Sequence, residues 1–241
     1  MILLLDIGNS RLKWALHDGV ALAAATAQIH GGDAAAAIAA IPARQVDAVW
    51  ISQVLGTAHE TEITAAVQRQ FACAPHFARV QKKFSGLTVA YADTSRLGID
   101  RWLMMLAAWR KTGTACCVVS AGTALTFDAV DAQGLHQGGF IAPGLTAMLD
   151  ATLGNTRFAA AMPDAQYHAG LGADTEACVR QGAYLASLGA IERGLIAAGA
   201  PTQRYLCGGD APLLLPQLGG GWQHRADLVL EGLLELAQTS I

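Results

Sequence analysis

The sequence predicts an α/β fold made of two similar halves. Segments with strand character alternate with segments of helical periodicity along the chain, which is the pattern of an α/β protein. A hairpin of two apolar strands joined by a glycine-containing turn occurs at residues 1–17 and again at residues 114–130. At 241 residues, the chain is long enough for two modest domains. We therefore expect one domain at residues 1–113 and a second at residues 114–241.

The first half begins with the first of these hairpins. The apolar run MILLL is ended by Asp6 and Gly8, and a second run begins at Lys13, which predicts a strand, a tight turn and a strand. Hydrophobic spacing then predicts a helix at 34–41, a buried strand at 46–52, and helices at 60–71 and 97–111. Thr57 and Thr61 are candidate N-caps for the helix at 60–71.

The second half repeats this opening. Residues 114–120 form an apolar, β-branched run, Ala121, Gly122 and Thr123 make a turn of small residues, and residues 124–130 form the next strand. Residues 138–141 continue the sheet. The remaining elements that we expect are helices at 144–153, 175–198 and 228–238 and a strand at 200–206.

Composition and charge restrict the function. Hydrophobic residues make up 53% of the chain and charged residues 15%, so a large core can form. The net charge is −3, and Lys and Arg are scattered, which argues against nucleic-acid binding. No apolar stretch reaches the ~18–20 residues of a membrane span. Asp6 ends the first apolar run too early for a signal peptide, so we expect a cytoplasmic protein without membrane contact.

The sequence lacks the residue patterns of several common types of site. The five cysteines contain no C-x-x-C pair, so neither a disulfide framework nor a zinc site is indicated, and we assign no cysteine a catalytic role. The seven histidines lack metal-ligand spacing. The sequence also lacks the nucleophile elbow of serine hydrolases and the P-loop of many kinases.

The first hairpin turn has the composition of a phosphate-binding loop. Gly8 lets the backbone approach a ligand, Asn9 and Ser10 can donate to phosphate oxygens, and Lys13 adds a positive charge. Asp6, at the strand end, is suited to hold magnesium through water. An ordinary hairpin turn explains the same residues, because Asp, Gly and Asn are common in turns.

The second hairpin turn offers a matching loop, in which the Thr123 hydroxyl can donate to phosphate. Two such loops in tandem halves are more specific evidence for phosphate binding than one.

Between the two loops, a helix begins with Gly98-Ile99-Asp100-Arg101, where a carboxylate can accept a proton and a guanidinium can bind a substrate carboxylate. A helix-start residue with a surface ion pair is the alternative for Asp100 and Arg101. The glycine pairs at 138–139 and 208–209 fit backbone against a flat ring, although turns alone explain them.

The ordered series DIGNSRLK, LGIDRW, AGTALTFD, GGFIAPGL and CGGD resembles the type III pantothenate kinases, a family that includes the Bvg accessory factor proteins. The resemblance extends from residue 1 to about residue 236. It implies two ribonuclease-H-like domains of the actin-like ATPase (acetate and sugar kinase/actin) superfamily and a homodimer. The implied reaction is the phosphorylation of pantothenate by ATP to 4′-phosphopantothenate, the first step of coenzyme A biosynthesis, with magnesium and potassium or ammonium.

The resemblance also implies roles for individual residues. Asp100 would accept the substrate proton, and Asp6 would hold magnesium through water. ATP phosphates would be bound by Asp6, Ile7, Gly8, Asn9, Ser10, Arg11, Leu12, Lys13 and Thr123. Pantothenate would be bound by Tyr91, Gly98, Ile99, Asp100, Arg101 and Thr175, and the nucleotide would be bordered by Gly138, Gly139 and Cys207 to Gly209.

One position departs from the family pattern. Ser120 stands where the family has an aspartate associated with the monovalent cation, so potassium or ammonium dependence is an open question, and Asp128 is a candidate substitute. Two alternatives are weighed against the pantothenate kinase: another small-molecule kinase of the superfamily, and an ATP-binding regulatory protein without turnover. The Gly98–Arg101 motif argues against the first. Retention of Asp6, Lys13, Asp100, Arg101 and Thr123 argues against the second.

Overall fold

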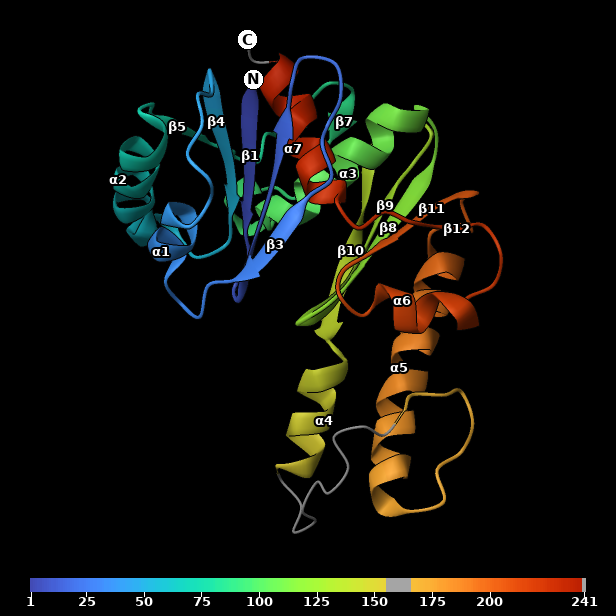
Figure 1. Ribbon diagram of the computed structural model, residues 1–241. Coiled ribbons are helices and arrows are strands. Elements are labelled where there is room, and N and C mark those ends of the chain that lie inside the picture. Colours follow the sequence, from blue (N-terminus) through green and yellow to red (C-terminus); the bar gives the residue numbers. More distant parts are fainter. Residues whose placement is uncertain (155–165, 240–241) are drawn as a thin grey trace. The chain divides into compact units, whose positions relative to one another are not determined.

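The computed structural model describes residues 1–154 and 166–239, which form two compact units (Figure 1). Unit 1 contains Met1–Ser85, Tyr91–Arg110 and the C-terminal segment that begins at Asp227. Unit 2 contains Gly86–Ala90 and Lys111–Ala226. The division therefore differs from the single boundary expected at residue 113, because the last helix packs with the first unit.

The elements of unit 1 form a sheet with helices. Its strands are β1 (Ile2–Ile7), β2 (Arg11–His17), β3 (Thr26–Ile29), β4 (Ala48–Gln53), β5 (Pro75–Phe77) and the short β6 (Lys83–Phe84). Its helices are α1 (Ala34–Ala39), α2 (Glu60–Phe71), α3 (Ile99–Thr112, which ends in unit 2) and α7 (Leu228–Thr239), with 3-10 turns η1 (Thr57–His59) and η2 (Thr94–Arg96).

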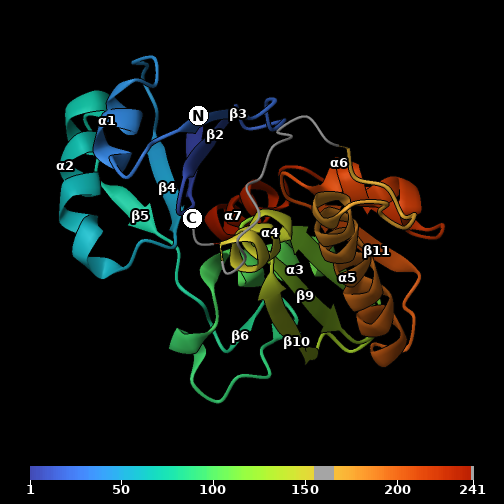
Figure 2. The same ribbon diagram turned by 90° about the horizontal axis from the view of Figure 1, so that it is seen from below.

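The sheet of unit 1 has the order β3-β2-β1-β4-β5. The first three strands pair antiparallel, whereas β4 and β5 run parallel to β1 and to each other. Alternate residues of β1 and β4 are buried against α1 and α2 in one core, which includes Leu3, Leu5, Ile7, Ile51, Ile38 and Val67. Figure 2 shows α1 and α2 on one side of this sheet and α7 on the other. Leu4 and Asp6, which alternate with the core residues, therefore face the α7 side.

Unit 2 has the same topology. Its elements are β7 (Leu87–Thr88), β8 (Cys116–Ala121), β9 (Ala124–Val130), β10 (His136–Pro143), α4 (Leu145–Leu153), α5 (Thr175–Ala197), β11 (Gln203–Cys207), α6 (Ala211–Leu214), η3 (Leu215–Gln217) and β12 (Trp222–His224). The sheet order is β10-β9-β8-β11-β12, again with three antiparallel strands followed by two parallel ones. Its core packs α5 against one sheet face through Val119, Phe127, Tyr184 and Ile191. The predicted duplication is thus present at the level of strand order.

Most predicted elements exist, with ends shifted by a few residues. β9 spans the predicted residues, and α2 begins and ends where helical spacing predicted. Neither Thr57 nor Thr61 caps α2, because its N-cap position is His59, without a side-chain hydrogen bond. The short edge strands β3, β5 and β12 were not predicted. Such strands carry only three or four residues, too few for a periodic signal.

The helix α5 spans 23 residues, and its N-terminus is capped by Asp174, whose side chain accepts a hydrogen bond from the Ala177 amide. Its apolar residues face the sheet of unit 2. Within the described residues, neither α5 nor any other helix combines the length and the apolar composition needed to cross a membrane.

The packing of α7 on α3 depends on Gly232. A Cβ atom at this position would lie 2.0 Å from the carbonyl oxygen of Leu103, which is backbone and cannot move aside as a side chain would. We expect Gly232→Ala to lower the free energy of unfolding by about 1–3 kcal/mol, as for an overpacked core, measured by urea denaturation. Gly182→Ala is the control, because a Cβ there meets no atom within 4 Å. It should leave stability unchanged or raise it, and an equal loss in both variants would contradict this account.

Candidate active site

The carboxylate of Asp6 is placed by strand register. Asp6 is the second-last residue of β1, and its backbone pairs with Lys13 on β2 and with Ser52 on β4. The three side chains are therefore neighbours at the carboxyl end of β1, on the sheet face opposite α1 and α2. This explains why residues distant in sequence reach one site.

The electrostatic surroundings of Asp6 disfavour its ionised form. The pKa of Asp6 is raised to about 6, first by burial and then by the nearby charge of Asp100, and this value includes the lowering effects of the Ser52 hydroxyl and the Lys13 charge. Ser52 Oγ is fully buried and, within the described residues, has no partner with hydrogen-bond geometry. Two carboxylates thus approach each other at a site with one adjacent lysine.

Lys13 is also close to a residue from the far end of the chain. Its Nζ lies 3.6 Å from Oδ1 of Asp227, immediately before α7, and both side chains are about one-third exposed. At this distance and exposure the ion pair is weak. The lysine therefore lies between Asp6 and Asp227, and its charge lowers the pKa of Asp6.

The Gly8–Arg11 loop exposes backbone donors. Gly8 N–H donates to Arg11 O at 2.9 Å, which closes the turn, while the amides of Asn9 and Ser10 donate to no acceptor within the described residues. A Cβ at Gly8 would only touch Arg11 O at 3.4 Å, so the chain itself does not require glycine here. Free amides beside an unobstructed backbone are typical of an anion-binding loop.

The predicted phosphate-loop residues do not all face the solvent. Asn9, Ser10 and Arg11 are exposed, as a binding loop requires. The side chains of Ile7 and Leu12 are completely buried in the core of unit 1, so only their backbone is available to a ligand.

The Gly98–Arg101 segment forms the first turn of α3. A Cβ at Gly98 would lie 2.6 Å from Asp100 Oδ1, so the glycine leaves room for the carboxylate to fold back over the helix N-terminus. A carboxylate is favoured there by the helix dipole. Together with the electrostatic effect of Asp100 on Asp6, this places the predicted proton acceptor beside the end of β1.

Arg101 and Tyr91 both belong to unit 1 and contact each other. The Arg101 side chain is only 4% exposed, its Nη1 donates to the Tyr91 hydroxyl at 3.2 Å, and its Cζ lies 6.0 Å from the centroid of the Tyr91 ring. Lys82 Nζ donates to the Tyr91 carbonyl oxygen at 2.8 Å. The structure thus brings together Tyr91 and Arg101, two of the six residues predicted to bind pantothenate.

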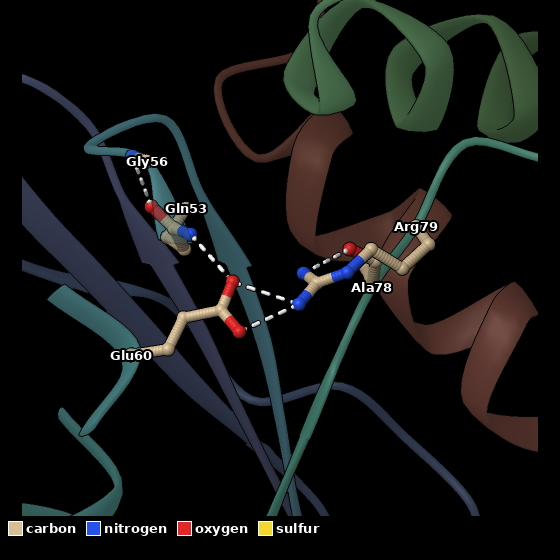
Figure 3. A network of polar contacts seen from close by, with 5 residues as sticks. All are labelled: Gln53, Gly56, Glu60, Ala78 and Arg79. Atoms are coloured by element: carbon tan, nitrogen blue, oxygen red, sulfur yellow. Dashed lines mark hydrogen bonds and ion pairs between the residues drawn. The ribbon is translucent and has the colours of Figure 1, made fainter. Parts of the chain in front are cut away.

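A polar network braces the neighbouring strand end (Figure 3). Arg79 Nη2 donates to both carboxylate oxygens of Glu60, at 2.7 Å each, and Gln53 Nε2 donates to Glu60 Oε1 at 3.1 Å. Gln53 Oε1 accepts from the Gly56 amide at 3.0 Å. Because Gln53 pairs with Ile7 in the sheet, this network fixes the loop after β4 beside the end of β1.

In unit 2 the turn between β8 and β9 is held by close backbone contacts. A Cβ at Gly144 would lie 1.9 Å from Gly122 O, and one at Gly208 would lie 2.1 Å from Ala121 O. Both glycines are therefore needed for packing. Gly122 has no atom within 4 Å of a built Cβ, and Thr123 is exposed, so this turn, like the first, leaves its tip accessible.

Ser120 occupies the position in unit 2 that Asp6 occupies in unit 1. Each is the second-last residue of the first strand of its sheet, on the face opposite the core helices. Ser120 pairs with Thr126 and with Cys207. The candidate substitute Asp128 is buried and bonded to His136 Nε2 at 3.0 Å, so the structure gives this carboxylate a different partner.

Other predicted residues lie apart from these turns. Gly138 and Gly139 pair with Ala129 and Asp128, at the end of β9 opposite the Thr123 turn, so the structure does not bring them to it. Gly138 has φ of +105° at a β-bulge, which explains a glycine there. Thr175 is the exposed first residue of α5, beside an open hollow of ≈ 570 Å³ lined by Gly172, Ala173, Asp174, Thr175, Cys178 and Val179.

Two of the cysteines are deeply buried. Burial raises the pKa of Cys116 and of Cys117 to about 12, so neither thiol ionises near neutral pH. Within residues 1–154 and 166–239, no group of three or more His, Cys, Asp or Glu side chains is arranged to hold a metal ion.

Several site residues were not predicted from the sequence. Ser52, Lys82 and Asp227 contribute to the surroundings of Asp6, Tyr91 and Lys13. Ser52 has a signal that could have been used, since a serine is unusual in a buried strand. Asp227 has none, because it follows Lys13 by more than two hundred residues.

Comparison with known proteins identifies similar sequences. The family model described as Type III pantothenate kinase matches residues 2–197. A Type III pantothenate kinase of Xanthomonas oryzae pv. oryzae (strain PXO99A) is 37% identical over 236 residues, which cover 95% of this chain and 94% of the relative. The protein of the same name from Nitrosococcus oceani is 32% identical over 250 residues, covering 99% and 94%.

Solved structures share the fold. A Campylobacter jejuni protein assigned to the Baf family of transcriptional activators has a TM-score of 0.62 at 20% identity and covers 99% of this chain and 98% of its own. The archaeal actin homologue Ta0583 has a TM-score of 0.50 at 10% identity, with coverage of 100% and 99%. At these identities the likeness concerns the fold alone. It confirms the predicted actin-like α/β fold.

The raised pKa of Asp6 leads to a pH-dependent stability. Its pKa is about 6 in the folded chain and ordinarily 3.8, so ionisation costs folding free energy above about pH 6, and the cost disappears below about pH 4. We expect Asp6→Asn to raise the free energy of unfolding at pH 7.5 by about 1–2 kcal/mol, allowing for solvent screening. Urea denaturation at pH 4, 6 and 7.5 measures this. A gain that is equal at all three pH values would contradict the assignment.

Proposed function

The chain belongs to the type III pantothenate kinase family, and on that basis we propose how its residues carry out the reaction. Family membership makes the chain a kinase that phosphorylates pantothenate in coenzyme A biosynthesis. The observation that carries the proposed mechanism is the grouping of Asp6, Lys13 and Asp100 at the carboxyl end of β1.

The reaction transfers the γ-phosphoryl group of ATP to the primary hydroxyl of pantothenate. The hydroxyl oxygen forms a bond to the γ-phosphorus, the bond to the β–γ bridging oxygen breaks, and ADP leaves. Asp100 accepts the hydroxyl proton, supported by its place in the first turn of α3 beside Asp6. Positioning and charge stabilisation supply most of the rate enhancement in such transfers.

The loop after β1 binds the ATP phosphates in this proposal. The exposed amides of Asn9 and Ser10 donate to phosphate oxygens, and Lys13 supplies positive charge. Gly8 supports the proposal because no packing contact requires it, so its missing side chain is free to admit a ligand. Thr123 in unit 2 remains a predicted phosphate contact.

The substrate carboxylate is bound by Arg101. A guanidinium forms paired hydrogen bonds with a carboxylate, and Tyr91 holds this one in place. Gly98 and Ile99 carry Asp100 and Arg101 at the helix start. Thr175 remains a predicted pantothenate contact beside the hollow at the start of α5.

The residues at the end of β1 fit magnesium bound mainly through water. Asp6 and Asp100 repel each other, and the buried Ser52 hydroxyl lacks a hydrogen-bond partner among the residues that the structure describes, so a hydrated divalent cation would relieve both. When bound, magnesium would neutralise charge on the ATP phosphates.

A strong monovalent cation site is not supported at Ser120. Serine offers a neutral oxygen, and Asp128 is held by His136. We therefore propose that potassium or ammonium has a smaller effect here than an aspartate at this position would allow.

Partners and compartment complete the proposal. ATP and pantothenate are the substrates that family membership implies. A homodimer is supported by exposed apolar side chains of unit 2, among them Ile141 and Leu171. The five cysteines are all free, which supports the cytoplasm.

Asp100→Asn tests the proton acceptor. The amide cannot accept the proton as a base, so we expect kcat for ATP-dependent phosphorylation of pantothenate to fall by about 10²–10⁴-fold, with an unchanged circular dichroism spectrum. Asp150→Asn, on the exposed surface of α4, is the control and should keep normal turnover. Near-normal turnover of Asp100→Asn would remove Asp100 from this role.

Ser120→Asp tests the cation proposal. Turnover of both proteins is measured in sodium alone and after addition of potassium or ammonium. We expect the native chain to turn over in sodium and the variant to gain stimulation by potassium, because a carboxylate binds cations more strongly than a hydroxyl. A native chain that requires potassium would show that Ser120 suffices, and no turnover in any salt would favour the regulatory alternative.

A further inference from the structure

We propose that His30 is a positioning residue, which holds the Gly8–Ser10 loop in the conformation that presents its free amides to phosphate. The proposal rests on the proposed function, in which this loop binds ATP. No motif in the sequence singles out His30. It follows β3, at the sheet edge next to the loop, and is more than twenty residues away in sequence.

His30 contacts the loop at two points. Its side-chain Nε2 lies 2.9 Å from the carbonyl oxygen of Gly8, and its backbone N–H donates to the carbonyl oxygen of Ser10 at 3.1 Å. The residue is 7% exposed, so water competes little for these hydrogen bonds. Two of the three carbonyl groups of the Gly8–Ser10 loop, those of Gly8 and Ser10, are therefore bound by His30.

The hydrogen bonds determine the tautomer of the ring. His30 Nδ1 accepts the Gly32 amide at 3.1 Å, so this nitrogen carries no proton. The proton of the neutral ring is then on Nε2, which donates to Gly8 O. The imidazole thus links the Gly8 carbonyl to the turn that follows β3, and that turn is closed further by Asp33 N–H donating to His30 O at 2.8 Å.

This arrangement has a direct consequence for the loop. A peptide unit whose carbonyl is bound cannot rotate freely, so the neighbouring N–H is fixed as well. The Gly8–Asn9 peptide carries the bound Gly8 carbonyl and the Asn9 amide, which has no acceptor within the described residues. His30 therefore orders a donor in advance of binding, and such preorganisation lowers the entropic cost of binding a phosphate.

A role of His30 in stability alone can be distinguished from positioning of the loop, because the chain contains a second histidine with similar burial and a similar local hydrogen bond. His17, at the opposite end of β2, is also buried at 5%, and its Nδ1 accepts the Gly19 amide in the same local pattern, at 3.3 Å. Within the part of the chain that the structure describes, its side chain makes no hydrogen bond with the Gly8–Ser10 loop. His17→Ala thus removes a comparable histidine from unit 1 without changing the loop's support.

Steady-state kinetics on the full chain test the proposal. We expect His30→Ala to raise KM for ATP by about tenfold, as for loss of one hydrogen bond to a binding loop, with KM for pantothenate changed less than twofold. His30→Gln should restore KM for ATP to within about threefold, because its Nε2 can reach Gly8 O. His30→Asn can replace only the Nδ1 acceptor and should behave as His30→Ala. His17→Ala should leave both KM values unchanged at a similar loss of thermal stability.

The outcomes separate this inference from the proposed function. Lys13→Ala should raise KM for ATP whether or not His30 positions the loop, and an unchanged value would show that the loop does not bind ATP. If Lys13→Ala raises KM for ATP and His30→Ala does not, the positioning role is wrong. Equal KM changes in His17→Ala and His30→Ala, or no recovery in His30→Gln, would likewise overturn it.

Discussion

The backbone pairing of β1 with β2 and β4 is the constraint on which the site depends. It places the Asp6 side chain on the face away from the core helices and opposite Lys13 and Ser52. A shift of one residue would turn Asp6 into the core and Ile7 out of it. Because Leu3, Leu5 and Ile7 are buried against α1 and α2, the hydrophobic effect holds this register and thereby the carboxylate.

The site is assembled at a cost to stability. Burial and a second carboxylate disfavour the ionised form of Asp6, and Lys13, which opposes this effect, also lies near Asp227. Such unfavourable arrangements persist at functional sites, where a ligand relieves them. The glycines of the two units fall into two groups. Gly98, Gly144 and Gly208 make room for protein atoms, whereas Gly8 and Gly122 leave space that the protein does not fill.

The duplicated topology gives a physical meaning to the departure at Ser120. Both sheets share one strand order, so Asp6 and Ser120 are equivalent positions, each at the end of a first strand. Asp6 carries a carboxyl group with a raised pKa, and Ser120 carries a neutral hydroxyl. The two halves therefore keep the same backbone plan while differing in the electrostatics of the strand end.

The sequence by itself determined the α/β class, the two hairpins, the longer helices and the motif residues, because periodic hydrophobicity and turn residues are local properties. It also led to the family. Only the tertiary structure showed that Ile7 and Leu12 face the core, that Gly138 lies away from the second turn, and that the C-terminal helix joins unit 1. It alone brought Ser52 beside Asp6, Asp227 near Lys13, and His30 to the first loop. Such contacts arise from the register of the sheet and from the return of the C-terminal segment to unit 1, and no local sequence pattern encodes either.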